Sequence, residues 1–211
     1  MITRPTRLEK LLAASRQKHI PKDQIILYQD DHSQEVFVIR RGVVKLHNID
    51  AQGNEKILHL VGDAGLIPFA FFSGDDQATH WFYTALTDCD MYVVPKEKLQ
   101  IAMQADNIVA IYLMNWFSNE VHELLMRLDS LGKTNVRDKL MAVLKFLAVR
   151  HSRQRSRSWW RVSFPVNHQL LADMIGMTRE STAAAMKELA DEKIIRNPRQ
   201  TVLEIDLPKV G

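Results

Sequence analysis

The segment NHQLLADMIGMTRESTAAAMKELADEKII, residues 167–195, holds the residues whose types and spacing best suit chemical recognition. Thr178, Arg179 and Glu180 lie at the start of an expected helix. An arginine can pair bidentately with the O6 and N7 atoms of guanine, and a glutamate can accept a hydrogen bond from the N4 amine of cytosine. Polar side chains at a helix start therefore predict reading of base edges in the major groove of DNA.

Two helices joined by a tight turn are needed to hold these side chains. Asn167 and Thr178 are suitable N-cap residues, and Gly176 permits the turn between the helices. Inward-facing residues recur at helical spacing, namely Leu170, Leu171, Met174 and Ile175 in the first helix and Thr182, Ala185, Met186 and Leu189 in the second. The outward residues of the second helix are Arg179, Glu180 and Ser181, with Lys187 further on. The pattern predicts a helix-turn-helix; a helical hairpin with a surface Arg-Glu pair is the alternative.

The stretch IIRNPRQTVLEI, which follows, is typical of a β-hairpin with its tip at residues 198–200. Such a hairpin forms a wing beside the two helices. It places Arg199 where it can contact a DNA phosphate.

The charge distribution supports a polyanionic partner. Residues 1–132 carry 13 Lys+Arg against 17 Asp+Glu, giving −4, whereas residues 133–211 carry 15 against 8, giving +7. Basic side chains that neutralise phosphates release condensed counterions and so favour binding to DNA. A solvated basic face without a partner is the alternative.

Composition limits the class of protein. The 211 residues are 46% hydrophobic, which is enough for two domains with real cores. Cys89 is the single cysteine, so an intrachain disulfide and a four-cysteine iron-sulfur cluster are excluded. Neither a secretion signal nor a run of eighteen apolar residues is present. These features predict a soluble cytoplasmic protein that makes no membrane contact.

The period of the apolar pattern divides the chain into three parts. Residues 24–95 read as short strands separated by turns and predict a compact antiparallel β-sandwich or roll, preceded by a short helix from Leu8 to Lys18. Beyond Pro95 the pattern becomes helical. The fold class is therefore α+β, with a β-roll sensor domain at 1–106, a dimerisation helix at 107–132 and a winged helix-turn-helix domain at 133–211.

A long helix is expected between the two domains. Its apolar residues alternate spacings of four and three, which is typical of a coiled-coil seam. The seam consists of Ala110, Met114, Phe117, Val121, Leu124, Leu128 and Leu131. Self-association along this seam predicts a homodimer; packing on the β-domain of the same chain is the alternative.

The basic stretch HSRQRSRSWWR, residues 151–161, predicts an exposed loop or hairpin tip. Contact with polymerase or DNA is one interpretation, and a hairpin tip with packed tryptophans is the other.

Taken together, these segments resemble the CRP/FNR family of bacterial transcription regulators over nearly the whole chain. EVFVIRRGVVKL is similar to the family's β-roll signature, and GMTRESTAAAMKELADEKII is similar to its helix-turn-helix. The resemblance implies a regulator and not an enzyme. It implies a homodimer on a roughly two-fold symmetric operator, contact with RNA polymerase as expected of an activator, and a small effector in the β-roll.

The resemblance also assigns roles by position. Arg179 and Glu180 match the family's base-reading pair, and Gln169 and Lys187 fall where phosphate contacts are expected. The position where relatives often carry a further base-reading arginine is Ala184, which implies fewer direct base contacts.

The effector residues depart from the cyclic-nucleotide pattern. Leu66 follows Gly65 where relatives have a Gly-Glu pair, and Ala78-Thr79 stand where an Arg-Ser pair would hold the phosphate. Burying a phosphate without a paired charge costs several kcal/mol, so we do not expect a conventional cyclic-AMP site.

Three interpretations of the β-roll interior remain. Its apolar lining could hold an uncharged or aromatic ligand, it could hold haem through a histidine such as His80, or it could be core alone. The residues assigned to this pocket are Leu66, Phe69, Phe72, His80, Trp81, Leu124 and Leu125.

Two rival classes are weighed against a regulator. A cupin-type metalloenzyme would need converging ligands, whereas His32, His47, His59 and His80 are scattered and no His-x-His occurs. A pure ligand-binding module would leave two features unexplained, namely the positive charge concentrated in residues 133–211 and the helix-turn-helix.

Overall fold

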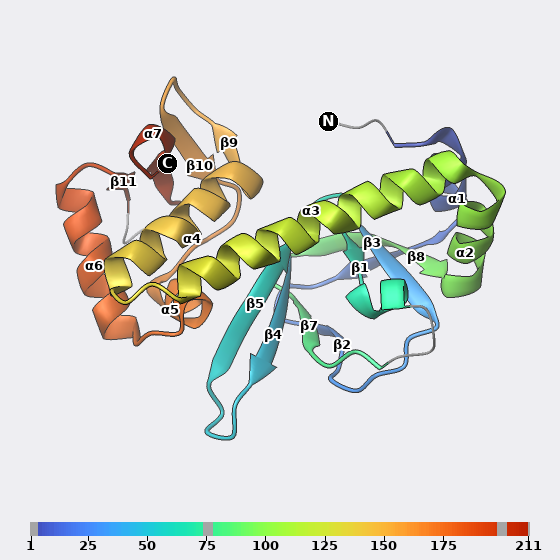
Figure 1. Cartoon of the computed structure of the whole chain (residues 1–211), viewed down its shortest axis with the longest axis horizontal. Coiled ribbons are helices and arrows are strands. Elements are labelled where there is room, and N and C mark those ends of the chain that lie inside the picture. Colours follow the sequence, from blue (N-terminus) through green and yellow to red (C-terminus); the bar gives the residue numbers. More distant parts are fainter. Residues whose placement is uncertain (1–3, 74–77, 198–201, 211) are drawn as a thin grey trace. The chain divides into compact units, whose positions relative to one another are not determined.

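The computed structural model describes residues 4–73, 78–197 and 202–210 (Figure 1). The chain forms two compact units, one from residues 1–48 and 58–122 and the other from residues 49–57 and 123–211. The boundary falls within one helix, α3, which spans Asn107–Leu131 and confirms the predicted long helix. Its first part, as far as His122, groups with the first unit, so this helix is not a separate body.

The first unit is built around two antiparallel sheets, in the strand orders β1-β8-β3-β6 and β2-β7-β4-β5. The strands are β1 Arg16–Ile20, β2 Ile25–Leu27, β3 Glu35–Arg41, β4 Val44–Ile49, β5 Glu55–Val61, β6 Leu66–Ile67, β7 Phe82–Ala85 and β8 Cys89–Pro95. Three helical elements accompany them, namely α1 Thr6–Ala13, the 3-10 turn η1 Phe69–Ser73 and α2 Lys96–Ala105. The predicted antiparallel β-roll is confirmed.

One hydrophobic cluster of this unit lies where α1, α2 and the start of α3 cover the first sheet. Its buried residues are Leu8, Leu12, Val36, Val38, Leu66, Phe71, Val94, Leu99, Ala102, Val109 and Leu113. Apolar side chains from four segments of the chain, 8–12, 36–38, 66–71 and 94–113, thus pack into one buried cluster. Burial of this kind supplies most of the free energy that stabilises a small domain.

The expected helix from Leu8 to Lys18 is wrong in its second half. The helix ends at Ala13, and Arg16–Ile20 instead forms β1, which pairs with β8 from Arg16↔Val93 to Ile20↔Cys89. Pairing with a strand that lies far along the chain, from Cys89 onward, overrides the local helical pattern.

The second unit contains the helices α4 Val136–Arg150, α5 His168–Ile175, α6 Arg179–Asp191 and α7 Leu207–Val210. A four-stranded antiparallel sheet completes it, in the order β11-β12-β10-β9. Its strands are β9 Ser152–Gln154, β10 Trp159–Val162, β11 Ile195–Arg196 and β12 Glu204–Asp206. The α+β class and the small C-terminal sheet are therefore confirmed.

Candidate DNA-binding site

The pair α5 and α6 forms the predicted helix-turn-helix, and its capping residues are confirmed. The Asn167 side chain accepts a hydrogen bond from Leu170 N at 2.7 Å, and Thr178 Oγ1 accepts one from Ser181 N at 3.2 Å. Gly176 ends α5 in the left-handed region with φ 65°, where a β-carbon is unfavourable. These local contacts fix where each helix begins and where the chain turns.

The inner faces of the two helices are buried as predicted. Leu170, Leu171, Met174 and Ile175 of α5 and Thr182, Ala185, Met186 and Leu189 of α6 all lie in the interior. The Thr182 hydroxyl is the one polar group in this set. It donates to Thr178 O at 2.9 Å, so it is satisfied within its own helix.

The outer surface of α6 leaves the predicted reading residues accessible. Arg179 and Glu180 are exposed at the helix start, and Ser181 is half-buried. Lys187 and Ala184 are also exposed further along the helix. A helix N-terminus with exposed polar side chains is the geometry that major-groove reading requires.

Two further predicted contacts have different outcomes. Gln169 is exposed at the start of α5, and its amide nitrogen donates to the Asp173 carboxylate at 2.6 Å, which holds the side chain against its own helix. Arg199 lies outside the residues that the structure describes, although β11 and β12 of the predicted wing are paired.

A buried cation beneath the helix-turn-helix was missed by sequence reasoning. Arg127, in the C-terminal part of α3, is 8% exposed, and its guanidinium donates to Met174 O at 2.7 Å and to Ile57 O at 2.5 Å. Burial lowers the pKa of Arg127 to about 10, so the group stays charged at neutral pH. A charged residue inside the apolar run LLMRLDSL was the available signal.

The small sheet confirms the predicted hairpin at residues 151–161, because β9 and β10 pair antiparallel. Arg161 of β10 donates through Nε and Nη2 to Glu204 Oε1 of β12, at 3.0 and 2.8 Å. Arg196 of β11 lies over the Trp159 ring, with 3.7 Å between Cζ and the ring centroid. The basic stretch is therefore an ordered hairpin that belongs to the wing sheet.

Comparisons with known proteins match both units. Residues 17–106 match the cyclic nucleotide-binding domain, and residues 138–209 match the Crp-like helix-turn-helix domain. The chain belongs to the CRP/FNR family of transcription regulators. It is a DNA-binding regulator and not an enzyme.

Relatives match along most of their length. The HTH-type transcriptional regulator ArcR of Staphylococcus epidermidis is 22% identical over 90% of this chain and 82% of its own. The fumarate and nitrate reduction regulatory protein of Vibrio cholerae is 27% identical over 85% of this chain and 71% of its own. Among solved structures, FixK2 from Bradyrhizobium japonicum superposes with a TM-score of 0.79 at 16% identity, over 93% of this chain and 96% of that one.

In this CRP/FNR-family chain, the residues predicted to line an effector pocket separate into an interior and a surface group. Leu66 and Phe69 are buried, and Phe72 is partly buried. Phe72 stacks on Phe117 with 4.6 Å between ring centroids, and Phe69 packs edge-on against Trp116 at 5.9 Å. The rings from η1 and α3 thus pack against one another inside the first unit.

The remaining predicted pocket residues lie elsewhere. His80 is exposed and packs edge-on against the half-buried Trp81, with ring centroids 6.0 Å apart. Leu124 is half-buried and Leu125 is 59% exposed, and both belong to the second unit. The exposed side chains of His80 and Leu125 therefore do not lie in a buried interior.

A buried polar pair in the first unit was also missed by sequence reasoning. His59 Nε2 of β5 lies 2.7 Å from Glu120 Oε2 of α3, and their side chains are 0% and 3% exposed. The Phe69 ring lies beside His59, at 6.1 Å between centroids. The pairing of His59 with Glu120 did not stand out in the sequence, because each is a lone polar side chain far from the other along the chain.

The other histidines that would serve a metalloenzyme have separate surroundings. His47 Nε2 lies 2.9 Å from Thr84 Oγ1 and its ring stacks on Phe82, whereas His32 and His80 are exposed. Their described surroundings differ from those of His59, so these four side chains do not form the converging ligand set that a cupin-type site needs.

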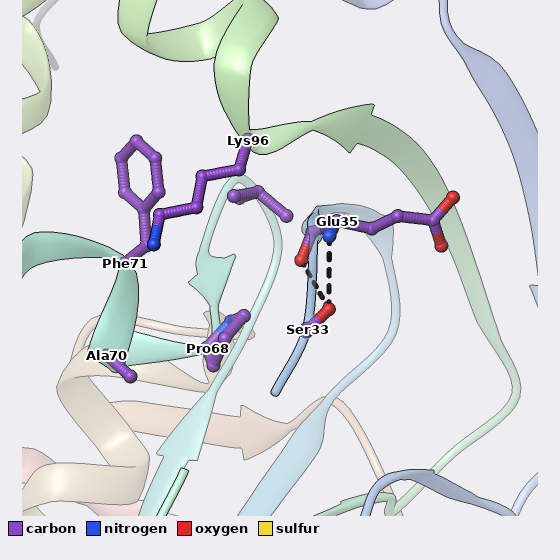
Figure 2. Close-up of a pocket in the computed structure, with 7 residues that line it drawn as sticks. Ser33, Glu35, Pro68, Ala70, Phe71 and Lys96 are labelled. Carbon is purple, nitrogen blue, oxygen red and sulfur yellow. Dashed lines mark hydrogen bonds between the residues drawn. The ribbon is translucent and has the colours of Figure 1, made fainter. Parts of the chain in front are cut away.

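A small surface pocket lies elsewhere in the first unit (Figure 2). Its lining residues are Ser33, Glu35, Val36, Pro68, Ala70, Phe71 and Lys96. Ser33 Oγ bonds to the main chain of Glu35, as the dashed lines show, and the Glu35 carboxylate accepts from Arg16 Nη2 at 3.0 Å. None of the predicted effector residues lines this pocket.

One stripe of α3 is apolar and exposed. Its exposed members are Ile111, Met114, Val121, Leu125 and Leu128, with Ser118 completing the alternation of three and four. Met114, Val121 and Leu128 belong to the predicted seam, whereas Phe117 packs on Phe72 of its own chain and Ala110, Leu124 and Leu131 are half-buried.

Among the helices of the described residues, none combines the length and the apolar composition that a membrane-spanning segment needs.

Proposed function

We propose that this CRP/FNR-family regulator acts as a homodimer that binds a roughly two-fold symmetric operator sequence-specifically. The observation that carries the proposal is the exposed, capped start of α6, where Arg179 and Glu180 project from a helix whose inner face is buried. Arginine and glutamate in this position suit guanine and cytosine edges.

The exposed apolar stripe of α3 supports self-association. Large apolar side chains are 62% exposed at Met114 and 66% exposed at Leu128, which is unfavourable for a chain that works alone. A spacing of three and four residues matches the seam of a two-stranded coiled coil. A second copy of the chain would cover the stripe and place two recognition helices about 34 Å apart, one turn of DNA.

The β-domain supports control by an effector other than cyclic AMP. Leu66 and Thr79 are each 2% exposed, and Thr79 Oγ1 donates to Trp81 O at 3.0 Å. The family resemblance places a phosphate-binding Arg-Ser pair at Ala78-Thr79, so this stretch supplies no cation for an anionic ligand. An uncharged or aromatic effector suits the aromatic rings of Phe69 and Phe72. The exposed His80 does not favour haem.

Selection of operators from random duplexes tests the function. The purified chain should enrich a two-fold symmetric sequence, and light scattering should give the mass of two chains on that duplex. Added cyclic AMP should leave the affinity for the selected duplex unchanged. Failure to enrich any sequence, or binding as a single chain, would contradict the proposal. Contact with RNA polymerase, which an activator requires, is tested separately by transcription from a promoter that carries the operator.

A further inference from the structure

Three side chains with metal-ligating atoms converge from β5 and α3. His59 of β5 and Glu120 and Glu123 of α3 each offer one ligand atom, and these atoms all lie within 4.8 Å of one another. His59 Nε2 lies 2.7 Å from Glu120 Oε2. Atoms that bind one Zn²⁺ ion lie about 2.0–2.2 Å from it, and so about 3–4.4 Å from each other. The three side chains are therefore close to the spacing that a shared ion requires.

The two carboxylates are brought together by α3 itself. Glu120 and Glu123 lie three residues apart in one continuous helix, Asn107–Leu131, so their side chains share a face. Two like charges at this spacing are unfavourable for a helix. A cation placed between the two carboxylates would turn this repulsion into attraction.

One positive side chain already contacts the cluster. Arg150 Nε donates to Glu123 Oε1 at 2.7 Å, which balances one of the two negative charges. A carboxylate has two oxygen atoms, each able to accept. Glu123 can therefore keep its bond to Arg150 and still bind an ion through its other oxygen.

Burial distinguishes this cluster from a surface ion pair. The side chains of His59 and Glu120 are 0% and 3% exposed, and that of Glu123 is 18% exposed. The Phe69 ring lies beside His59, at 6.1 Å between centroids. A buried carboxylate costs free energy unless it is paired or coordinates a metal. The contact with His59 accounts for one buried acid, whereas a second acid on the same helix face is what a metal ligand set requires.

The ligand types indicate which ion the cluster fits. Imidazole suits zinc, iron and nickel, and carboxylates suit manganese. Mg²⁺ and Ca²⁺ take oxygen ligands, and soft Cu⁺ takes sulfur, which none of these three side chains supplies. One imidazole nitrogen and two carboxylate oxygens therefore favour a divalent first-row transition metal with a further position open to water.

We propose that His59, Glu120 and Glu123 bind one divalent first-row transition-metal ion, with Zn²⁺ held more tightly than Mn²⁺. The general order of divalent metal affinities sets this preference. Arg150 orients the Glu123 carboxylate, as hydrogen-bonded partners of ligating carboxylates do. The bound ion would tie β5 to α3. The site goes beyond operator binding and does not depend on it.

Equilibrium dialysis of the full chain, first stripped with EDTA, tests the site with Zn²⁺ and with Mn²⁺. The ligand variants are His59→Asn, Glu120→Gln and Glu123→Gln, which remove the ligating nitrogen or a carboxylate charge. The matched controls are His122→Asn, at an exposed histidine between the two glutamates, and Glu97→Gln, at an exposed glutamate of α2. Thermal unfolding in EDTA confirms that each variant folds.

The wild-type chain should bind one Zn²⁺ ion, and Mn²⁺ more weakly. Each ligand variant should bind Zn²⁺ at least about a hundredfold more weakly, since losing only an outer partner of a ligand costs about 10–100-fold. Zn²⁺ should raise the Tm of the wild-type chain and of both controls but not that of Glu123→Gln. Glu123→Gln is the decisive variant, because it leaves the buried His59–Glu120 pair intact.

Three results would overturn the inference. The first is a wild-type chain that takes up no Zn²⁺. The second is a folded Glu123→Gln chain that binds Zn²⁺ as tightly as the wild type, which would leave His59 and Glu120 as a structural pair. The third is loss of Zn²⁺ binding in His122→Asn, which would place the ion on the surface of α3. These measurements contain no DNA, so their outcome is separate from that of operator selection.

Discussion

The guanidinium of Arg127 donates a hydrogen bond to the main-chain oxygen of Met174, 2.7 Å away in the last turn of α5. The last carbonyl groups of a helix have no partner within the helix, so a buried helix end needs an outside donor. Arg127 supplies one and also bonds to Ile57 O. One buried cation thus joins the C-terminal part of α3 and the start of β5 to the helix that precedes the turn.

Replacing Arg127 by methionine should destabilise the second unit. Methionine fills much of the same volume but leaves the Ile57 and Met174 carbonyls without their donor, which costs about 1–3 kcal/mol. Urea unfolding should show this loss. Arg137→Met is the control, because Arg137 forms an exposed pair with Glu192 and should change stability by less than about 1 kcal/mol. A more stable Arg127→Met chain would mean that desolvation of the charge outweighs its hydrogen bonds.

Features set by neighbouring residues were predictable from the sequence, whereas contacts across the chain were not. The caps Asn167 and Thr178 and the turn at Gly176 act within three or four residues, so their types alone located the helix-turn-helix. Strand β1 was mistaken for helix because its partner lies far along the chain.

The same limit applied to the sites. Met114 and Leu128 matched a seam pattern, but whether Phe117 faces a second chain or its own η1 depends on packing that a periodic pattern does not encode. The partners of Arg127 and the His59–Glu120 pair were hidden for the same reason.

Arg179→Ala should weaken binding to the selected operator by about 1–3 kcal/mol and relax preference at one base pair per half-site. The cause is loss of a bidentate pair at a base edge. Lys187→Ala is the matched comparison, since an exposed lysine on the same helix should contact phosphate. It should lower the salt slope by about 0.9 and leave base preference intact. Anisotropy on a panel of single-base operator variants measures both. Equal weakening on every sequence would make Arg179 a phosphate contact.

Tyr83 should make stability sensitive to alkaline pH. Burial raises the pKa of Tyr83 to about 12, above the usual value near 10 in an unfolded chain. The folded state therefore holds this proton more tightly, and the resulting stability is present below pH 10 and is lost as pH rises toward 12. Urea unfolding should be measured at about pH 9 and about pH 11.5. Between these pH values, the free energy of unfolding should fall more for the wild-type chain than for Tyr83→Phe. Tyr28→Phe, at a 56% exposed site, should fall as the wild type does. Equal falls in all three chains would exclude Tyr83 as the cause.

Leu128→Glu should convert the proposed dimer into single chains. Leu128 is 66% exposed on the apolar stripe of α3, and two glutamates brought together in a seam would be both desolvated and mutually repelled. Light scattering should show the mass falling to 24.3 kDa, that of one chain. Operator affinity should drop by about tenfold or more, because one recognition helix then binds without the other. Asn119→Glu is the control, since this exposed residue lies on α3 away from the stripe and should leave the dimer intact. A Leu128→Glu chain that stays dimeric would place the interface on another surface.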